Sequence, residues 1–242
     1  MRWIRLWFFL IIKFMVLTSL RDNKQYFWIK VPRTATQAFS KFFTLYVPKE
    51  PGIPDDIHSH FSYLELKEMY QQQLPAVSVV RHPVSRFKSI IYYLADRHPN
   101  TQSSAKLLWE STESCVNFLN TVFDRNCELK GASISSIFLD TDVTEVTPIR
   151  NFINATASFF KTQAEYAYHP KVKIFHYEKL NEFIEWIDTS LGYDTSKIHR
   201  FNASVESTQI NVDFNHPEFV KTIENLYYID YKVFGYPLRY LL

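Results

Sequence analysis

The sequence YFWIKVPRTATQAF, residues 26–39, joins a strand pattern to a helix pattern through a short polar loop. Aromatic and β-branched residues between Tyr26 and Val31 are typical of a buried strand, and Pro32 ends it because proline cannot donate to a sheet ladder. Apolar residues then recur at the spacing of one helix face: Ala38, Phe39, Phe42, Phe43 and Tyr46. The loop at residues 33–36 is therefore expected between the end of a strand and the start of a helix.

This kind of loop is a common binding site for phosphate or sulfate groups. The free N–H groups of a first helical turn and the positive end of the helix dipole both attract anions. Arg33 adds a cation, and Thr34 and Thr36 add hydroxyl groups that we expect to face the same volume. The loop contains no glycine and does not match the Walker A pattern GxxxxGK[ST]. An ordinary strand-to-helix connection with an exposed arginine is the alternative.

Length and composition favour one domain, which we expect at residues 21–242. A chain of 242 residues with 46% hydrophobic content can bury one large core, and a net charge of only +2 argues against binding of long nucleic acids. Cys115 and Cys127 lack the spacing of a zinc site, although they could pair in an oxidising compartment. Anion specificity must therefore come from local clusters of residues.

Residues 1–20 are strongly apolar but contain Arg5 and Lys13. The longest uninterrupted apolar run, Leu6 to Ile12, is short for a membrane span of about 20 residues. A lysine inside a span costs about 2.5 to 3.5 kcal/mol on insertion scales. Three alternatives stay open: a single-pass signal anchor, a surface helix or strand packed on the domain, or an extension upstream of a working start at Met15.

Strand and helix patterns alternate along the rest of the chain, which predicts a parallel sheet flanked by helices. The predicted strands are residues 76–80, 134–139 and 172–177. The predicted helices start after a Ser62–Glu65 capping box and at Pro83, and further helices are expected at residues 114–124, 152–166, 178–191 and 217–231.

A second polar turn follows the predicted strand 76–80. In the sequence VRHPVSRFKS, residues 80–89, Arg81 at the strand end offers a planar fork to a phosphate, and Ser89 lies two helical turns further on. A surface helix with scattered basic residues would also explain Arg86 and Lys88. It would not explain why two turns with the features of an anion-binding site both lie at the carboxyl ends of predicted strands, where open α/β sheets bind ligands.

A third segment, DDIHSHFSYLEL at residues 55–66, places His58 and His60 on a loop just before a predicted helix. Histidine is the side chain whose ordinary pKa lies nearest neutrality, so it can serve as a general base. A loop histidine is more often an ordinary surface residue, and only the neighbouring segments single these two out.

The three segments resemble motifs of the carbohydrate sulfotransferases that use 3′-phosphoadenosine 5′-phosphosulfate (PAPS), in particular the Golgi-type heparan, chondroitin and uronyl O-sulfotransferases. The first resembles their phosphosulfate loop, with Arg33 in place of the usual lysine and Gln37 in place of a small hydroxyl residue. The second resembles their 3′-phosphate motif, with His82 in place of aspartate. The third resembles the segment of their catalytic histidine, with which His60 aligns and His58 is the nearby alternative.

Four shorter matches extend the resemblance over residues 26–236. They are residues 160–163, 175–180, 200–204 and 228–236, similar in order to the family's Gln motif, its Tyr-Glu-x-Leu strand, its Asn-x-Ser loop near the nucleotide and its closing Tyr-x-x-Asp-Tyr-x-x-Phe-Gly-Tyr. Asn202 lies in the third of these matches.

The resemblance implies a P-loop-NTPase-like sulfotransferase fold and transfer of a sulfuryl group from PAPS to a hydroxyl of a carbohydrate or another acceptor. His60 would be the general base, and Arg33 would stabilise charge on the leaving phosphate. A role of the family's loop lysine as a proton donor does not apply to Arg33 of this chain, because arginine is effectively never deprotonated. The scheme requires no metal. The implied PAPS-binding residues are Pro32, Arg33, Thr34, Ala35, Thr36, Gln37, Arg81, Ser89 and Asn202.

Two other functions remain compatible with the sequence. A nucleotide-dependent phosphotransferase is disfavoured by the missing Walker A pair and the absence of an evident Mg²⁺-holding carboxylate. A non-catalytic glycan- or nucleotide-binding relative is kept open by the departures at Arg33, Gln37 and His82. The expected location is the membrane, as a single-pass Golgi-like protein anchored by residues 1–20, or the cytoplasm.

Overall fold

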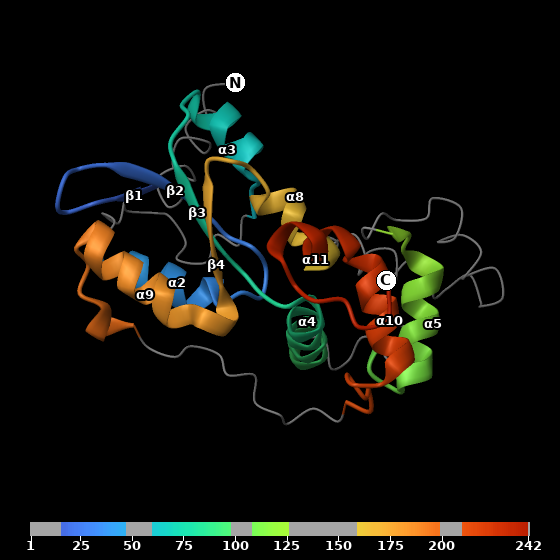
Figure 1. The fold of residues 1–242 in the computed structure, drawn as a ribbon. Coiled ribbons are helices and arrows are strands. Elements are labelled where there is room, and N and C mark those ends of the chain that lie inside the picture. Colours follow the sequence, from blue (N-terminus) through green and yellow to red (C-terminus); the bar gives the residue numbers. More distant parts are fainter. Residues whose placement is uncertain (1–15, 47–59, 98–107, 126–158, 199–209, 242) are drawn as a thin grey trace, which may run out of the picture. The chain divides into compact units, whose positions relative to one another are not determined.

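The computed structural model describes residues 16–46, 60–97, 108–125, 159–198 and 210–241 (Figure 1). The chain forms two compact units, each built from two segments. Unit 1 comprises residues 1–81 and 165–203, and unit 2 comprises residues 82–164 and 204–242. The described strands all lie in unit 1, whereas helices dominate the described part of unit 2.

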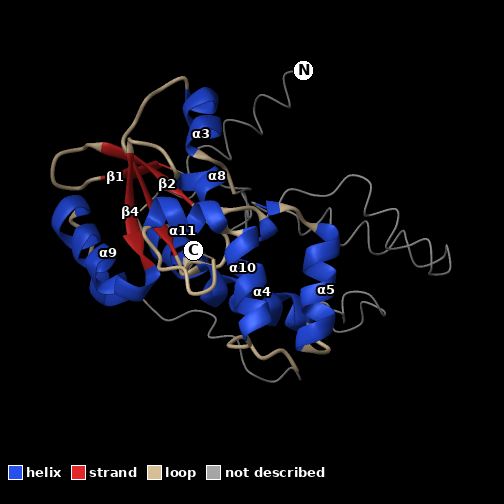
Figure 2. Ribbon diagram, turned by 45° about the vertical axis from the view of Figure 1, so that its right-hand side comes forward, coloured by secondary structure: helices blue, strands red, loops and turns tan. Residues whose placement is uncertain are grey.

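Unit 1 contains a four-stranded mixed sheet with the strand order β1-β2-β3-β4 (Figure 1), and its strands are red in Figure 2. Its strands are β1 (Val16–Thr18), β2 (Gln25–Ile29), β3 (Ala76–Val80) and β4 (Val172–His176). Neighbours among β2, β3 and β4 are parallel, whereas β1 is antiparallel to β2. The predicted α/β class is confirmed, but the sheet is not wholly parallel. The chain returns from β1 to β2 through a short turn, and so short a connection permits only antiparallel pairing.

Helices pack on both faces of this sheet. Phe27 and Trp28 are consecutive in β2, so their side chains point to opposite faces. The Trp28 ring stacks on Phe183 of α9 (Leu180–Trp186) and meets Phe43 of α2 (Thr36–Phe43) edge-on. The Phe27 ring meets Tyr63 and Tyr70 of α3 (Tyr63–Tyr70). The aromatic strand predicted from the sequence therefore anchors a helix layer on each side.

The helices around the sheet begin and end close to their predicted positions. The capping box that opens α3 is confirmed, because the Ser62 hydroxyl accepts the Glu65 N–H and the Glu65 carboxylate accepts the Ser62 N–H. The predicted helix 178–191 divides into a 3-10 turn (Tyr177–Lys179), α9 and a π-helix (Ile187–Leu191). It ends at Gly192, whose φ of 73° suits glycine. A further 3-10 turn is formed by Thr195–Lys197.

Unit 2 contains α4 (Pro83–Arg97), α5 (Thr112–Val122), α10 (Pro217–Leu226) and α11 (Tyr228–Phe234). The apolar face predicted for α4 is fully buried: Phe87, Ile90, Ile91 and Leu94. The predicted final helix is interrupted at Tyr227, where φ is −108°. The predicted helix 152–166 is interrupted at residues 161–162, after which α8 (Gln163–Ala167) begins. Residues 126–158, including the predicted strand 134–139, lie outside the described residues.

A buried polar cluster holds unit 2 together. The Asp230 carboxylate, fully buried, accepts the backbone N–H groups of Gln163 (2.9 Å) and Ala164 (2.8 Å) and the side-chain amide of Gln163 (3.3 Å). Arg86, also buried, donates to the carbonyl oxygens of Phe159 (2.8 Å) and Lys161 (3.0 Å). Burial raises the pKa of Asp230, and the Arg86 charge and the N–H donors oppose that rise. Segments 160–163 and 228–236 thus meet in one cluster.

The end of the apolar N-terminal segment belongs to the sheet. Residues 16–18 form β1, Leu17 is fully buried, and the Tyr193 hydroxyl donates to the Thr18 carbonyl oxygen at 2.7 Å. For these residues, the strand is the alternative that the structure supports. Residues 1–15 lie outside the described part of the chain. Within the described ranges, every helix is too short or too polar to span a bilayer.

Candidate functional site

The loop between β2 and α2 has an unusual backbone. Arg33 (φ 66°) and Ala35 (φ 64°) both adopt the left-handed conformation, although neither is glycine. Each such residue costs about 1–3 kcal/mol, and such strain is concentrated at functional sites. Ala35 is the N-cap residue of α2 and makes no side-chain capping bond, so no cap side chain satisfies the first N–H groups of this helix. The loop has the features of an anion site.

The two threonines of the loop are both buried, and the hydrogen bond of the Thr34 hydroxyl differs from the expectation that this group faces a ligand. Thr34 is fully buried, and its hydroxyl donates to the Val31 carbonyl oxygen at 2.9 Å. A hydroxyl has a single proton to donate, so Thr34 fastens the loop to the strand end and can offer an anion only its backbone N–H. Thr36 begins α2 with 7% of its surface exposed.

His60 lies against the start of the same loop. Its Nδ1 is 2.7 Å from the Lys30 carbonyl oxygen. A carbonyl oxygen only accepts hydrogen bonds, so Nδ1 carries the proton in this contact, and Nε2 is the basic nitrogen of that tautomer. The capping box at Ser62 fixes the start of α3 just after His60 and thereby sets the position of the histidine. The half-buried His60 is thus oriented as a base.

Lys30, at the start of the loop, was missed by the sequence analysis. Its side chain is only 8% exposed, and burial lowers the pKa of its amine to about 8. Among the described residues, no hydrogen bond or ion pair to its amine is found. The sequence does contain a signal, because a lysine inside a run of buried strand residues is unusual.

Arg81 lies at the carboxyl end of β3. Val80 pairs with His176 in the parallel ladder, so Arg81 and Tyr177 leave neighbouring strands at the same level. The Arg81 guanidinium carbon lies 4.2 Å from the centre of the Tyr177 ring. Stacking on a ring face holds the guanidinium plane, and the fork of N–H groups in that plane matches the geometry of a phosphate. Since β2 and β3 are parallel, the loop after β2 leaves from the same edge of the sheet.

The other predicted site residues divide by location. Pro32 and Gln37 lie on the loop and in the first turn of α2, whereas Ser89 lies on α4 in unit 2. Asn202 and His58 lie outside the described residues. Unit 1 therefore brings together the strained loop, His60, Lys30 and, at the same sheet edge, Arg81.

No protein-family model, curated protein or solved structure matches the chain. The chemistry of the site is therefore derived from its own geometry. A helix N-terminus without a side-chain cap, two cations on the loop and a third at the next strand end suit an anionic ligand. An imidazole whose Nδ1 is bonded to the Lys30 carbonyl oxygen has Nε2 as its basic nitrogen, which suits removal of a proton from a hydroxyl.

The low pKa of Lys30 predicts a pH-dependent stability. Its folded pKa of about 8 lies below the ordinary value of 10.5, so the unfolded chain binds more protons between these values and the free energy of unfolding rises with pH there. We expect the difference in unfolding free energy between wild type and Lys30→Met to change by about 1–2 kcal/mol between about pH 7 and pH 9.5, in favour of wild type.

Urea unfolding of the two proteins across this range measures the difference. Lys24→Met, which replaces an exposed lysine of the same unit, is the matched control for the loss of a lysine at the surface. A pH-independent difference between wild type and Lys30→Met would contradict the burial of a titrating amine.

Proposed function

We propose that this protein is a sulfotransferase that moves a sulfuryl group from PAPS to a hydroxyl of a carbohydrate or a similar acceptor. The observation that carries the proposal is the 2.7 Å contact of His60 Nδ1 with the Lys30 carbonyl oxygen, which supports a role for His60 as a base beside the strained loop. The three parallel strands β2, β3 and β4, with this loop after the first, support a P-loop-like sulfotransferase fold.

In this proposal the loop holds the phosphosulfate of the donor. The N–H groups at the start of α2 and the Arg33 guanidinium bind the 5′-phosphate and the sulfuryl oxygens. Arg81, at the carboxyl end of β3, binds the 3′-phosphate. Thr34 contributes its backbone N–H, since its hydroxyl proton is donated to Val31.

The transfer step follows from these positions. The acceptor oxygen attacks sulfur while its proton passes to Nε2 of His60, and the bond between sulfur and the bridging oxygen breaks. The electron pair of that bond goes to the 5′-phosphate, where Arg33 and the helix N–H groups stabilise the added charge. Because arginine does not lose its proton, the leaving phosphate departs as an anion paired with Arg33. The sum of these steps needs no metal ion.

The 3′-phosphate contact predicts a selective loss of nucleotide binding. Arg81→Ala is expected to weaken binding of adenosine 3′,5′-bisphosphate by about 1.5–3 kcal/mol, the range of a hydrogen bond to a charged group. Binding of adenosine 5′-phosphosulfate, which lacks the 3′-phosphate, should barely change. Isothermal titration calorimetry with both ligands measures the two effects.

Arg125 offers a matched control for this experiment. Its guanidinium carbon lies 3.8 Å from the centre of the Tyr228 ring in unit 2, so Arg125→Ala removes an arginine of the same stacked kind. The Arg125→Ala variant should bind both nucleotides with the affinity of wild type. An equal loss for both nucleotides in Arg81→Ala would contradict the assignment of the 3′-phosphate to Arg81.

A further inference from the structure

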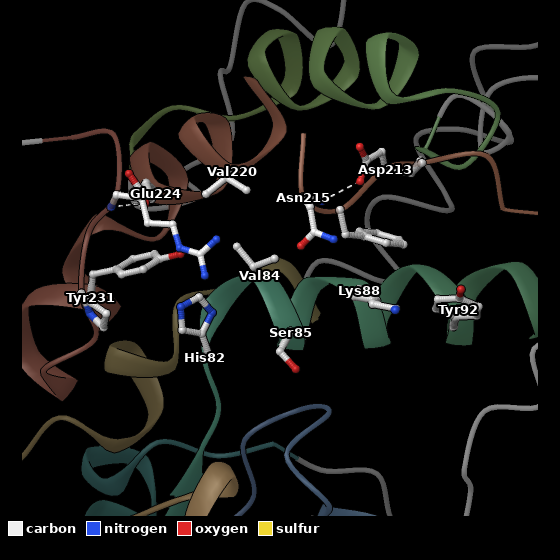
Figure 3. Close-up of a pocket in the computed structure, with 14 residues that line it drawn as sticks. His82, Val84, Ser85, Lys88, Tyr92, Asp213, Asn215, Val220, Glu224 and Tyr231 are labelled. Carbon is white, nitrogen blue, oxygen red and sulfur yellow. Dashed lines mark hydrogen bonds between the residues drawn. The ribbon is translucent and has the colours of Figure 1, made fainter. Parts of the chain in front are cut away.

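Unit 2 contains a pocket of about 510 Å³ within its own residues (Figure 3). One wall is the first half of α4, from His82 to Tyr92, and another is the segment 212–215 before α10. The third wall is formed by α10, α11 and the C-terminal tail. The volume lies in the range of pockets that hold small organic ligands.

Tyr231 gives one end of this pocket an unmet hydrogen-bond donor. Only 2% of the residue is exposed, and its hydroxyl has no hydrogen-bond partner among the described residues. Burial raises the pKa of Tyr231, so the hydroxyl keeps its proton at neutral pH. His82 lies beside it, with the ring centres 5.5 Å apart (Figure 3). A buried polar group without a partner is costly, and a ligand oxygen in the pocket would supply the missing acceptor.

The cations that line the pocket also have uncommitted N–H groups. The Arg239 guanidinium makes no hydrogen bond or ion pair with the rest of the described chain. The Lys88 amine lies 5.7 Å from the Tyr92 ring centre and 5.5 Å from that of Phe214, and it too lacks an ion pair within the described residues. The aromatic rings therefore form a wall that also positions a positive charge.

The carboxylates of the pocket, in contrast, are already bonded. Glu224 accepts the backbone N–H groups of Arg239 (2.6 Å), Tyr240 (2.9 Å) and Leu241 (3.0 Å), which ties the C-terminal tail to α10. Asp213 accepts the Asn215 N–H at 2.9 Å. The carboxylates of the pocket are therefore bonded, whereas the donors of Tyr231, Arg239 and Lys88 are not bonded within the described part of the chain, which favours a ligand that brings acceptor oxygens.

We propose that this pocket binds a small anionic sugar, a pyranose ring that carries a sulfate, phosphate or carboxylate group. The charged group accepts hydrogen bonds from Tyr231 and Arg239, and the ring lies against the Phe214 and Tyr92 side, where Lys88 adds a second positive charge. A bare inorganic anion would leave the aromatic side of the pocket unused. The inference goes beyond the proposed function, because the pocket lies in unit 2 and binds its ligand without PAPS.

The test uses the full chain and four probes: glucose, glucuronate, glucose 6-sulfate and glucose 6-phosphate. Saturation-transfer NMR titrations should show the charged sugars binding at least about tenfold more tightly than glucose. Tyr231→Phe removes only the hydroxyl, so it should weaken the charged sugars about tenfold without lowering the melting temperature, since the lost group has no partner in the free protein. Arg239→Gln should weaken them similarly, whereas Lys221→Gln, an exposed lysine of α10 outside the pocket, should not.

Other outcomes would overturn the inference. If glucose binds as tightly as the charged sugars, or if Tyr231→Phe binds the charged sugars with unchanged affinity, binding in the pocket does not depend on the charged group. Binding of inorganic sulfate as tight as that of glucose 6-sulfate would show that the sugar ring contributes nothing to the affinity. If adenosine 3′,5′-bisphosphate displaces the sugars and itself loses affinity in Tyr231→Phe, the pocket belongs to the nucleotide. Failure of wild type to bind that nucleotide would instead count against the sulfotransferase proposal and leave the sugar pocket standing.

Discussion

Replacing His60 by alanine is expected to lower the rate of sulfuryl transfer by about 10² to 10⁴, the usual contribution of a general base. The imidazole is held through Nδ1 by the Lys30 carbonyl oxygen, and in the proposed step Nε2 takes the proton of the acceptor. His60 has no role in holding the nucleotide in this scheme, so the affinity for adenosine 3′,5′-bisphosphate should stay within a few-fold of wild type. Initial rates with labelled PAPS and equilibrium binding together separate the two effects.

Two further variants sharpen this experiment. His60→Asn keeps an amide N–H that can donate to the Lys30 carbonyl oxygen but removes the basic nitrogen, so it should be as slow as His60→Ala while retaining wild-type stability. His58→Ala tests the neighbouring histidine. A large loss there alone would move the base by two positions, and losses below about fivefold in all three variants would contradict a histidine base.

The second large effect is expected at Asp230, where the change is in stability. Asp230→Ala should lower the free energy of unfolding by about 3–5 kcal/mol, because it leaves the buried Arg86 charge without its counter-charge and the N–H groups of Gln163 and Ala164 without an acceptor. Urea unfolding followed by circular dichroism measures the loss.

Asp213 supplies the matched control. It is an exposed aspartate of the same unit whose side chain accepts one local hydrogen bond, from the Asn215 N–H, so Asp213→Ala should cost less than about 1 kcal/mol. A comparable small loss for Asp230→Ala would mean that the buried cluster does not hold segments 160–163 and 228–236 together.

Local patterns predicted much of unit 1. Strand β3 occupies residues 76–80 as expected, because a short apolar run between polar turns leaves few alternatives. The Ser62–Glu65 capping box also depends only on neighbouring residues. Strand β1 could not be predicted in the same way, since Val16–Thr18 lies at the end of a long apolar segment whose pattern does not distinguish a strand from a helix or anchor.

Several features of the site could not be predicted from the sequence. The loop and His60 were singled out separately, but the hydrogen bond between His60 and residue 30 joins positions far apart in the chain and depends on the tertiary fold. The burial of Lys30, and with it the low pKa, is equally a tertiary property. Thr34 was predicted to face the ligand because a hydroxyl near an anion loop suggests binding, whereas the backbone turn directs its proton to Val31.

The most direct test of the sulfotransferase proposal is transfer of radiolabelled sulfate from PAPS to a panel of desulfated glycans by the full chain. We expect a labelled glycan and an equal amount of adenosine 3′,5′-bisphosphate, and we expect both products to fall at least about 100-fold with His60→Ala. Tight binding of adenosine 3′,5′-bisphosphate without any labelled glycan would contradict transfer to the glycans tested and favour a non-catalytic binding protein. The absence of both nucleotide binding and transfer would contradict the account as a whole.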